Sequence, residues 1–96
     1  MSIRYEWDEA KNRANRKRHG VSFEEARTVF LDENARLIAD PDHSADEDRF
    51  LLLGLSLGLR LLVVSHCYRQ SDEVVRIISA RRADPSERRE YGRWLK

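Results

Sequence analysis

Residues 49–80 read RFLLLGLSLGLRLLVVSHCYRQSDEVVRIISA, and this stretch decides the fold. Its leucines, valines and isoleucines form three runs, over residues 49–57, 59–67 and 74–80. Runs of this length predict strands, and the first two would join near Gly58 as a hairpin. The third run is apolar on both faces, which is typical of a central strand. Consecutive strands with short links predict an antiparallel meander.

A transmembrane helix is a poorer explanation of the same stretch. The apolar run 50–65 is shorter than the roughly 20 residues that span a bilayer. It is also interrupted by Gly54, Gly58 and Arg60. The N-terminus, MSIRYEWDEA, carries no apolar signal region. We therefore expect a cytoplasmic protein without a membrane partner.

Helix signals lie on both sides of the predicted meander. Asp8 is a good N-cap for a first helix that ends at Gly20. This helix is so polar that we expect a narrow packing face of Ala10 and Ala14. The sequence Ser-Phe-Glu-Glu at 22–25 is a capping box that begins a second helix.

The second helix carries an apolar stripe at helical spacing. The stripe consists of Phe23, Ala26, Val29 and Phe30. Asp-Pro-Ser-Glu at 84–87 begins a last helix, and short strands are predicted at 3–7 and 35–39. The order β-α-α-β-β-β-β-α indicates an α+β fold, in which an antiparallel sheet packs against two N-terminal helices and one C-terminal helix. Residues 1–96 are expected to form a single domain.

Charge is nearly balanced in total but uneven along the chain. Eighteen Lys and Arg against seventeen Asp and Glu give a net charge of +1. Residues 11–19 and 76–96 are basic, whereas residues 32–48 are acidic. Basic ends suit a surface that faces a polyanion, and ordinary solvated helix faces explain the pattern equally well.

Several kinds of chemistry find no support in the sequence. A single Cys excludes a disulfide framework and a multi-Cys zinc site. His66 and Cys67 are neighbours on a predicted strand, so their side chains point to opposite faces and could not easily share one ion. The sequence has no glycine-rich phosphate loop and no Gly-x-Ser-x-Gly motif. We therefore expect neither a metal nor a cofactor.

The remaining candidates are basic residues and histidines, the groups that cleave RNA without a metal. Such cleavage needs a base, an acid and cations that stabilise the phosphorane. His19 ends a helix, where the helix dipole favours its protonated form. His66 fits a satisfied interior residue better than a catalyst, and His43, in an acidic turn, fits a solvated one.

Arg76 is the most informative single residue, because a charge inside an apolar strand must be paired or functional. It could contact substrate, or it could form an ion pair with Glu47 or Asp48. Strand alternation places Arg76 and Arg81 on opposite faces unless a bulge intervenes. Arg49 has the same two alternatives, an ion pair or phosphate binding.

Four stretches of the chain, in order and at the right spacing, resemble the BrnT toxin family. They read WDxxKxxxN at 7–15, RHGVxFEEA at 18–26, DHSxxExR at 42–49 and VRIISARRA at 75–83, the last followed by Glu87, Arg88 and Tyr91. The resemblance implies a RelE-like fold and a ribonuclease toxin of a type II toxin–antitoxin pair. It also implies a BrnA-like antitoxin with a ribbon-helix-helix domain, through which alone the pair would contact promoter DNA.

One departure from the family lies at position 18, where Lys is common and this chain has Arg18. The charge is kept, but an arginine does not transfer protons. Our hypothesis is therefore a metal-independent endoribonuclease in which His19 is the first choice for proton transfer, ahead of His66 and Tyr91. The alternatives are a nucleic-acid-binding module without catalysis and a module that only binds the antitoxin.

The hypothesis assigns two groups of residues. The expected catalytic residues are His19, Arg49, Arg76, Arg81 and Tyr91. The expected substrate-binding residues are Lys11, Arg18 and Arg82.

Overall fold

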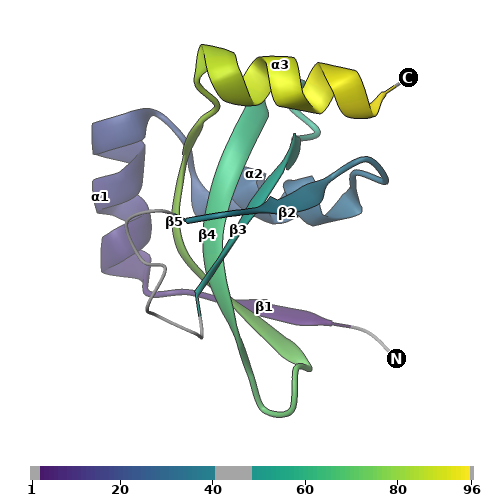
Figure 1. Ribbon diagram of the computed structural model, residues 1–96. Helices are drawn as coiled ribbons and strands as arrows, with labels where there is room; N and C mark the ends of the chain where they lie inside the picture. Colours follow the sequence, from purple (N-terminus) through teal and green to yellow (C-terminus); the bar gives the residue numbers. More distant parts are fainter. Residues whose placement is uncertain (1–2, 41–48, 96) are drawn as a thin grey trace.

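The chain forms its helices and strands in the predicted order β-α-α-β-β-β-β-α. A computed structural model describes residues 3–40 and 49–95 (Figure 1). Its elements are β1 (Arg4–Glu6), α1 (Glu9–His19), α2 (Phe23–Thr28), the 3-10 turn η1 (Val29–Leu31), β2 (Arg36–Ile38), β3 (Phe50–Leu55), β4 (Leu61–Arg69), β5 (Val74–Arg82) and α3 (Pro85–Trp94). None of the helices in these two ranges is long and apolar enough to cross a membrane.

The strands form one five-stranded sheet in the order β1-β5-β4-β3-β2. Strands β2 to β5 pair antiparallel with their sequence neighbours, which confirms the meander. The middle strand is β4, whereas β5 lies between two strands only along residues 74–76, where β1 pairs with it. The sheet as a whole is mixed, because β1 pairs with β5 in parallel. The expectation of a purely antiparallel sheet was wrong at this edge, since alternation within a three-residue strand carries no information on its direction.

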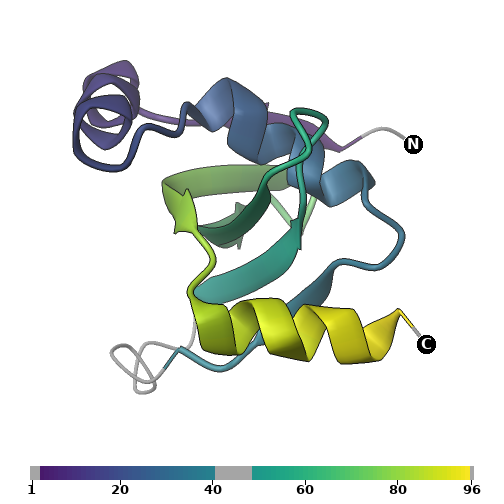
Figure 2. The same cartoon turned by 90° about the horizontal axis from the view of Figure 1, so that it is seen from above.

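Helices lie on both sides of the sheet. Figure 2 shows α2 over one face and α3 over the other, with α1 beside the β5 end of the sheet. The α2 face buries the larger core, which includes Phe23, Val64 and Ile77, and the α3 face buries a smaller core around Leu53 and Tyr91. The fold is therefore α+β, as expected.

Helix α1 packs through amides and not through alanines. Ala10 and Ala14 are exposed, whereas Asn12 and Asn15 are buried. The Asn12 side chain accepts a hydrogen bond from the Phe23 backbone N–H at 2.8 Å. The predicted alanine face was wrong, because a buried amide that is fully hydrogen-bonded packs at no penalty.

The ends of the helices follow their predicted caps with one exception. Gly20 ends α1 in the left-handed conformation (φ 70°), and Asp84 and Glu87 form a complete capping box for α3. Ser22 accepts the Glu25 backbone N–H at 3.0 Å, which is half of the box expected for α2. The Glu25 carboxylate completes no box, because it binds Arg60.

Candidate functional site

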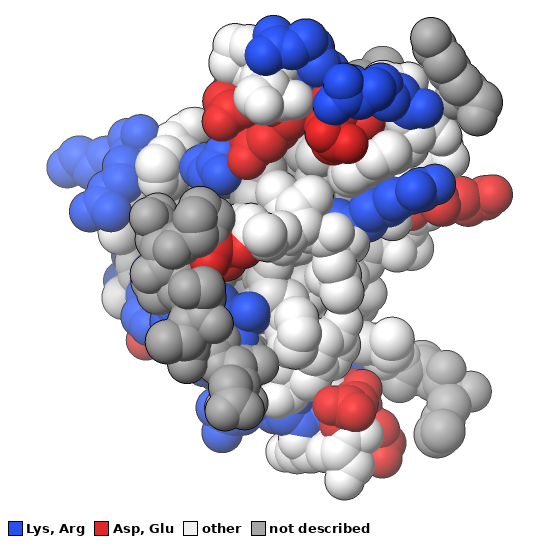
Figure 3. Space-filling model, viewed as in Figure 1, with Lys and Arg blue, Asp and Glu red and all other residues white. Residues whose placement is uncertain are grey.

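Helix α1 displays most of the positive charge of the N-terminal region. Its last turn contains Arg16, Lys17, Arg18 and His19, and Lys11 and Arg13 precede them. All six side chains are exposed. Figure 3 shows Lys and Arg over α1 and over α3, with Asp and Glu beside those of α3 and a largely uncharged surface in the middle of the view.

A cleft of about 260 Å³ lies between α1 and the middle of β5. It brings together three residues predicted from the sequence, Lys11, Arg18 and His19. Ser79 of β5 lies on the opposite wall. The cleft thus combines two permanent cations, an imidazole and a hydroxyl, which is a set that can bind a phosphate and move a proton.

Asn15 holds the two walls of this cleft together. Its side-chain NH₂ donates to the carbonyls of Val21 and Ala80, each at 2.8 Å. Its oxygen accepts the Ala80 backbone N–H at 3.1 Å. Because β1 pairs only with residues 74–76 of β5, no strand within the described ranges pairs with the later part of β5 on that side, and Asn15 takes the place of one.

A β-bulge in β5 determines which way its arginines point. The pairing passes from Ser65–Ser79 to His66–Ile77, so Ile78 is an extra residue on β5. As a result Arg76, opposite Cys67, and Arg81 share the face that α3 partly covers. The plain alternation that would have put them on opposite faces does not hold.

Both of these arginines are already in ion pairs. Arg76 donates to the Glu6 carboxylate at 2.9 Å, so it forms an ion pair, as one of its two alternatives predicted. The acids named as its partners, Glu47 and Asp48, lie outside the described residues. Arg81 binds Glu87 through two hydrogen bonds of 2.8 and 2.9 Å. This pair lowers the pKa of the Glu87 carboxyl and raises the pKa of Arg81.

Tyr91, Arg82 and Arg49 do not join the α1 cleft. Tyr91 is buried in the α3-side core and its hydroxyl donates to Asp32 at 2.6 Å. Burial and this hydrogen bond raise the pKa of Tyr91 to about 12. Arg82 and Tyr91 line another cleft near the β3–β4 turn, and Arg49 directly precedes β3.

His66 lies inside the α2-side core, as expected, but it is not fully satisfied. Its Nδ1 donates to the Val64 carbonyl at 3.1 Å, and its Nε2 has no partner among the described residues. The rings of Phe30, Phe50 and Tyr68 surround it. Burial lowers the pKa of His66, and the residue does not reach the α1 cleft. Its neighbour Cys67, expected in the core, is half-buried.

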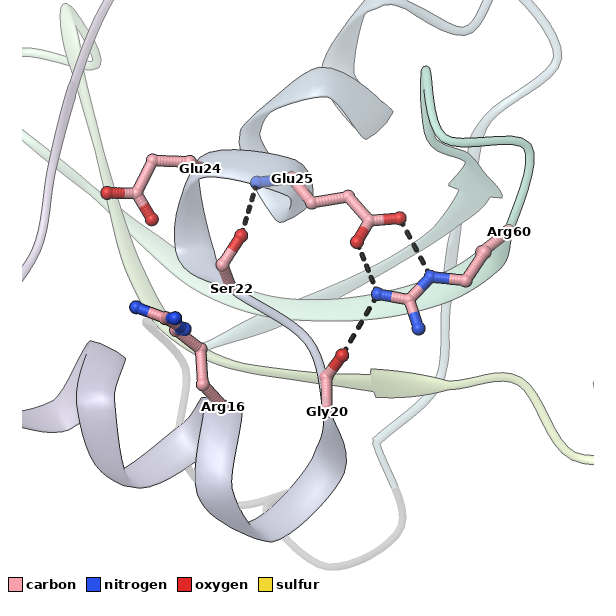
Figure 4. Close-up of a pocket in the computed structure, with 6 residues that line it drawn as sticks. All are labelled: Arg16, Gly20, Ser22, Glu24, Glu25 and Arg60. Atoms are coloured by element: carbon pink, nitrogen blue, oxygen red, sulfur yellow. Dashed lines mark hydrogen bonds and ion pairs between the residues drawn. The ribbon is translucent and has the colours of Figure 1, made fainter.

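A further cleft, of about 440 Å³, lies where α1, α2 and the β3–β4 turn meet (Figure 4). Arg60 donates to both oxygens of Glu25 and to the Gly20 carbonyl. Glu24 and Arg16 face the cleft beside this pair. The hydrogen bonds of Arg60 hold the pKa of Glu25 below its usual value, so the pair is a fixed strut between helix and turn.

The sequence reasoning missed Ser79 and the structural role of Asn15. Two asparagines three residues apart on a polar helix were the available signal, because an isolated helix gains little from Asn. His43, Asp46, Glu47 and Asp48 lie outside the described residues. Across the ranges 3–40 and 49–95, no three His, Cys, Asp or Glu side chains are grouped as metal ligands.

Comparison with known proteins identifies relatives of this chain. No curated protein matches it. The fold is similar to the crystal structure of the ribonuclease toxin BrnT of Brucella abortus, with a TM-score of 0.67 and 24% identity over 86% of this chain and 99% of that one. The family model "Ribonuclease toxin, BrnT, of type II toxin-antitoxin system" matches residues 7–87. The chain therefore belongs to the BrnT family of ribonuclease toxins from type II toxin–antitoxin systems.

Proposed function

We propose that this chain is a metal-independent endoribonuclease whose reaction takes place at the cleft between α1 and β5. The observation that carries the proposal is the convergence of Lys11, Arg18 and His19 on one cleft of about 260 Å³. Family membership supports RNA as the substrate. The cleft supports a mechanism based on an imidazole and fixed cations.

The proposed reaction is attack by the 2′-hydroxyl of the RNA on the adjacent phosphate. The 2′-oxygen forms a bond to phosphorus as the bond to the 5′-oxygen breaks, which leaves a 2′,3′-cyclic phosphate and a 5′-hydroxyl. Water accepts the 2′-hydroxyl proton, and His19 donates a proton to the departing 5′-oxygen. Arg18 and Lys11 stabilise the charge that develops on the phosphate.

The other predicted residues receive roles that fit their positions. Arg76 and Arg81 share one face of β5, and each keeps guanidinium donors beyond its ion pair, so we propose that they guide the RNA backbone across the sheet. Arg49 and Arg82 remain candidates for backbone contacts further along. We propose a positioning role for Tyr91, because its hydroxyl proton is bound to Asp32.

The proposed partner is a BrnA-like antitoxin with a ribbon-helix-helix domain, and the toxin would meet promoter DNA only through it. Membership of a type II toxin–antitoxin family supports an antitoxin partner. We also propose that the fold is of the RelE type and that the protein acts in the cytoplasm, where its RNA substrate is found.

A binding module without catalysis is the second candidate. The observation that favours it is a basic surface on α1 outside the cleft, formed by Arg13, Arg16 and Lys17. Such a surface binds nucleic acid through its phosphates whether or not a reaction follows.

Replacement of His19 separates the two candidates. We expect His19→Ala to slow RNA cleavage in a translation extract by about 10²- to 10⁴-fold, because a general acid–base group contributes that much. The matched control is Arg93→Ala, an exposed basic residue of α3 outside the cleft, with an expected change below about threefold. Mapping of the new RNA ends completes the experiment.

Two outcomes would contradict the proposal. New 5′-phosphate ends would exclude attack by the 2′-hydroxyl. RNA that is shifted on a gel by the parent protein but stays intact would favour the binding module.

A further inference from the structure

The β3–β4 turn exposes two leucines that the proposed reaction does not use. Leu57 is 71% exposed and Leu59 is 79% exposed, more than any other large apolar side chain in the described ranges. Leu59 also adopts a positive φ of 63°, a conformation that costs a leucine free energy. Exposed apolar side chains on a strained turn point to a contact with another molecule.

The turn is held rigidly, so its leucines are displayed in a fixed position. The Leu57 backbone N–H donates to the Thr28 hydroxyl at 2.9 Å, and the Ser56 hydroxyl donates to Glu25 at 2.7 Å. Arg60 closes the turn on Glu25 and the Gly20 carbonyl (Figure 4). A surface that is already ordered loses little conformational entropy when it binds a partner.

A cleft beside the turn adds positive charge to the apolar surface. Its volume is about 290 Å³, and its lining includes Leu55, Leu59, Leu61, Arg60, Arg82 and Arg88. Arg60 forms an ion pair with Glu25. Arg82 and Arg88 make no side-chain hydrogen bond or ion pair with any residue of the described ranges. The surface therefore suits a ligand that is both apolar and acidic.

We propose that the turn at residues 56–60 and this adjoining cleft form the docking surface for the antitoxin, through a segment with apolar and acidic side chains. The inference rests on the proposed function for the existence of that partner. A protein segment fits better than RNA, because leucine side chains neither stack on bases nor bind phosphates. It also fits better than a second copy of this chain, because a symmetric contact would bring Arg82 and Arg88 close to their own copies.

The double variant Leu57→Ser/Leu59→Gly tests the surface without endangering the fold. Glycine is at ease at a positive φ, so the second substitution relieves strain. We expect its affinity for the antitoxin encoded beside the toxin gene to fall at least about 30-fold, the loss typical of a central apolar anchor. Leu37→Ser, a change at a 55% exposed leucine of β2, should alter the affinity less than about threefold.

The charged part of the surface has its own test. Arg88→Glu should weaken antitoxin binding about tenfold or more, because it sets an acid against an acidic segment. RNA cleavage by the free toxin should stay at the parent rate in both the double variant and Arg88→Glu.

Four outcomes separate this inference from the proposed function. Loss of antitoxin binding with unchanged RNA cleavage supports both, and loss of binding in a protein that never cleaves RNA supports the docking surface alone. Unchanged antitoxin affinity in the double variant overturns the docking surface. If the parent is a dimer and the double variant is a monomer with that unchanged affinity, the turn binds a second copy of the chain instead. Loss of RNA cleavage with intact antitoxin binding also overturns it, since the turn would then serve RNA.

Discussion

His66 is a single residue whose surroundings make the stability of the fold depend on pH. It is fully buried, and burial lowers its pKa from the usual 6.5. Just below pH 6.5, His66 therefore binds a proton in the unfolded chain but not in the folded chain. Stability does not depend on this group above that pH and falls as the pH drops from 6.5 toward the lowered pKa.

We expect the free energy of unfolding in urea to decrease between pH 7.5 and pH 5.5, by at most about 1.4 kcal/mol per pH unit from this one proton. The control is His66→Phe, which places a ring among Phe30, Phe50 and Tyr68 and removes the titrating group. The variant should lose much of that dependence. Equal slopes in the two proteins would mean that His66 accepts a proton in the folded state.

Among the elements, α1 depends on one amide for its place beside β5. Asn15 makes three buried hydrogen bonds, to the Val21 carbonyl and to both backbone groups of Ala80. Asn15→Ala leaves these groups without partners in a site that is 7% exposed at Asn15. We expect a loss of about 2–4 kcal/mol in the free energy of unfolding, since each orphaned buried group costs about 1–3 kcal/mol.

The same substitution should slow RNA cleavage in the protein that remains folded, because α1 carries His19 and Arg18 to the cleft. Ala10→Ser is the matched control, an exposed change on the same helix outside the cleft, with an expected loss below about 0.5 kcal/mol. A stable, fully active Asn15→Ala protein would show that α1 is held by other contacts.

Elements of this fold differ in how far the sequence predicts them. Caps and hydrophobic period are local, so Asp8, Gly20 and the 84–87 box predicted the helix ends correctly. The parallel pairing of β1 and the bulge at Ile78 arise between segments far apart in the chain. The charges in the sequence identified Arg76 and Arg81 of β5 as candidate site residues. Only the bulge places both of them on the same face of the sheet.

The candidate site shows the same limit. The basic composition of α1 and its terminal His19 were visible in the sequence, and the structure places them with Lys11 on one cleft. Tyr91 was equally visible, but its direction depends on Asp32, 59 residues away in the chain. A contact between residues so far apart in the chain leaves no local signal in the sequence. For this reason the sequence could not show that Tyr91 lies outside the cleft that contains His19.

At the scale of the whole molecule, the charges nearly cancel, but they are distributed unevenly over the surface. The net charge is only +1, so attraction to RNA cannot come from the molecule as a whole. It must come from the basic surface over α1 (Figure 3). This surface adjoins the turn that we assign to the antitoxin, because Arg60 of the turn donates to the Gly20 carbonyl at the end of α1 and lines a cleft with Arg16. The two kinds of contact nevertheless use different side chains, Arg13 and Lys17 for RNA and Leu57 and Leu59 for the antitoxin, so substitutions can alter them one at a time.

Salt dependence measures that local attraction. For a 2′-O-methyl RNA strand, which cannot undergo attack by its 2′-oxygen, we expect affinity to fall with salt by about 0.7 logarithmic units per decade for each phosphate contact. The triple variant Arg13→Ala/Arg16→Ala/Lys17→Ala should lower this slope by about two if its three side chains each contact a phosphate. Arg93→Ala, on α3, should leave the slope unchanged. If the triple variant keeps the slope of the parent, α1 does not bind the RNA phosphates, and the arginines of the sheet face would be the RNA-binding surface instead.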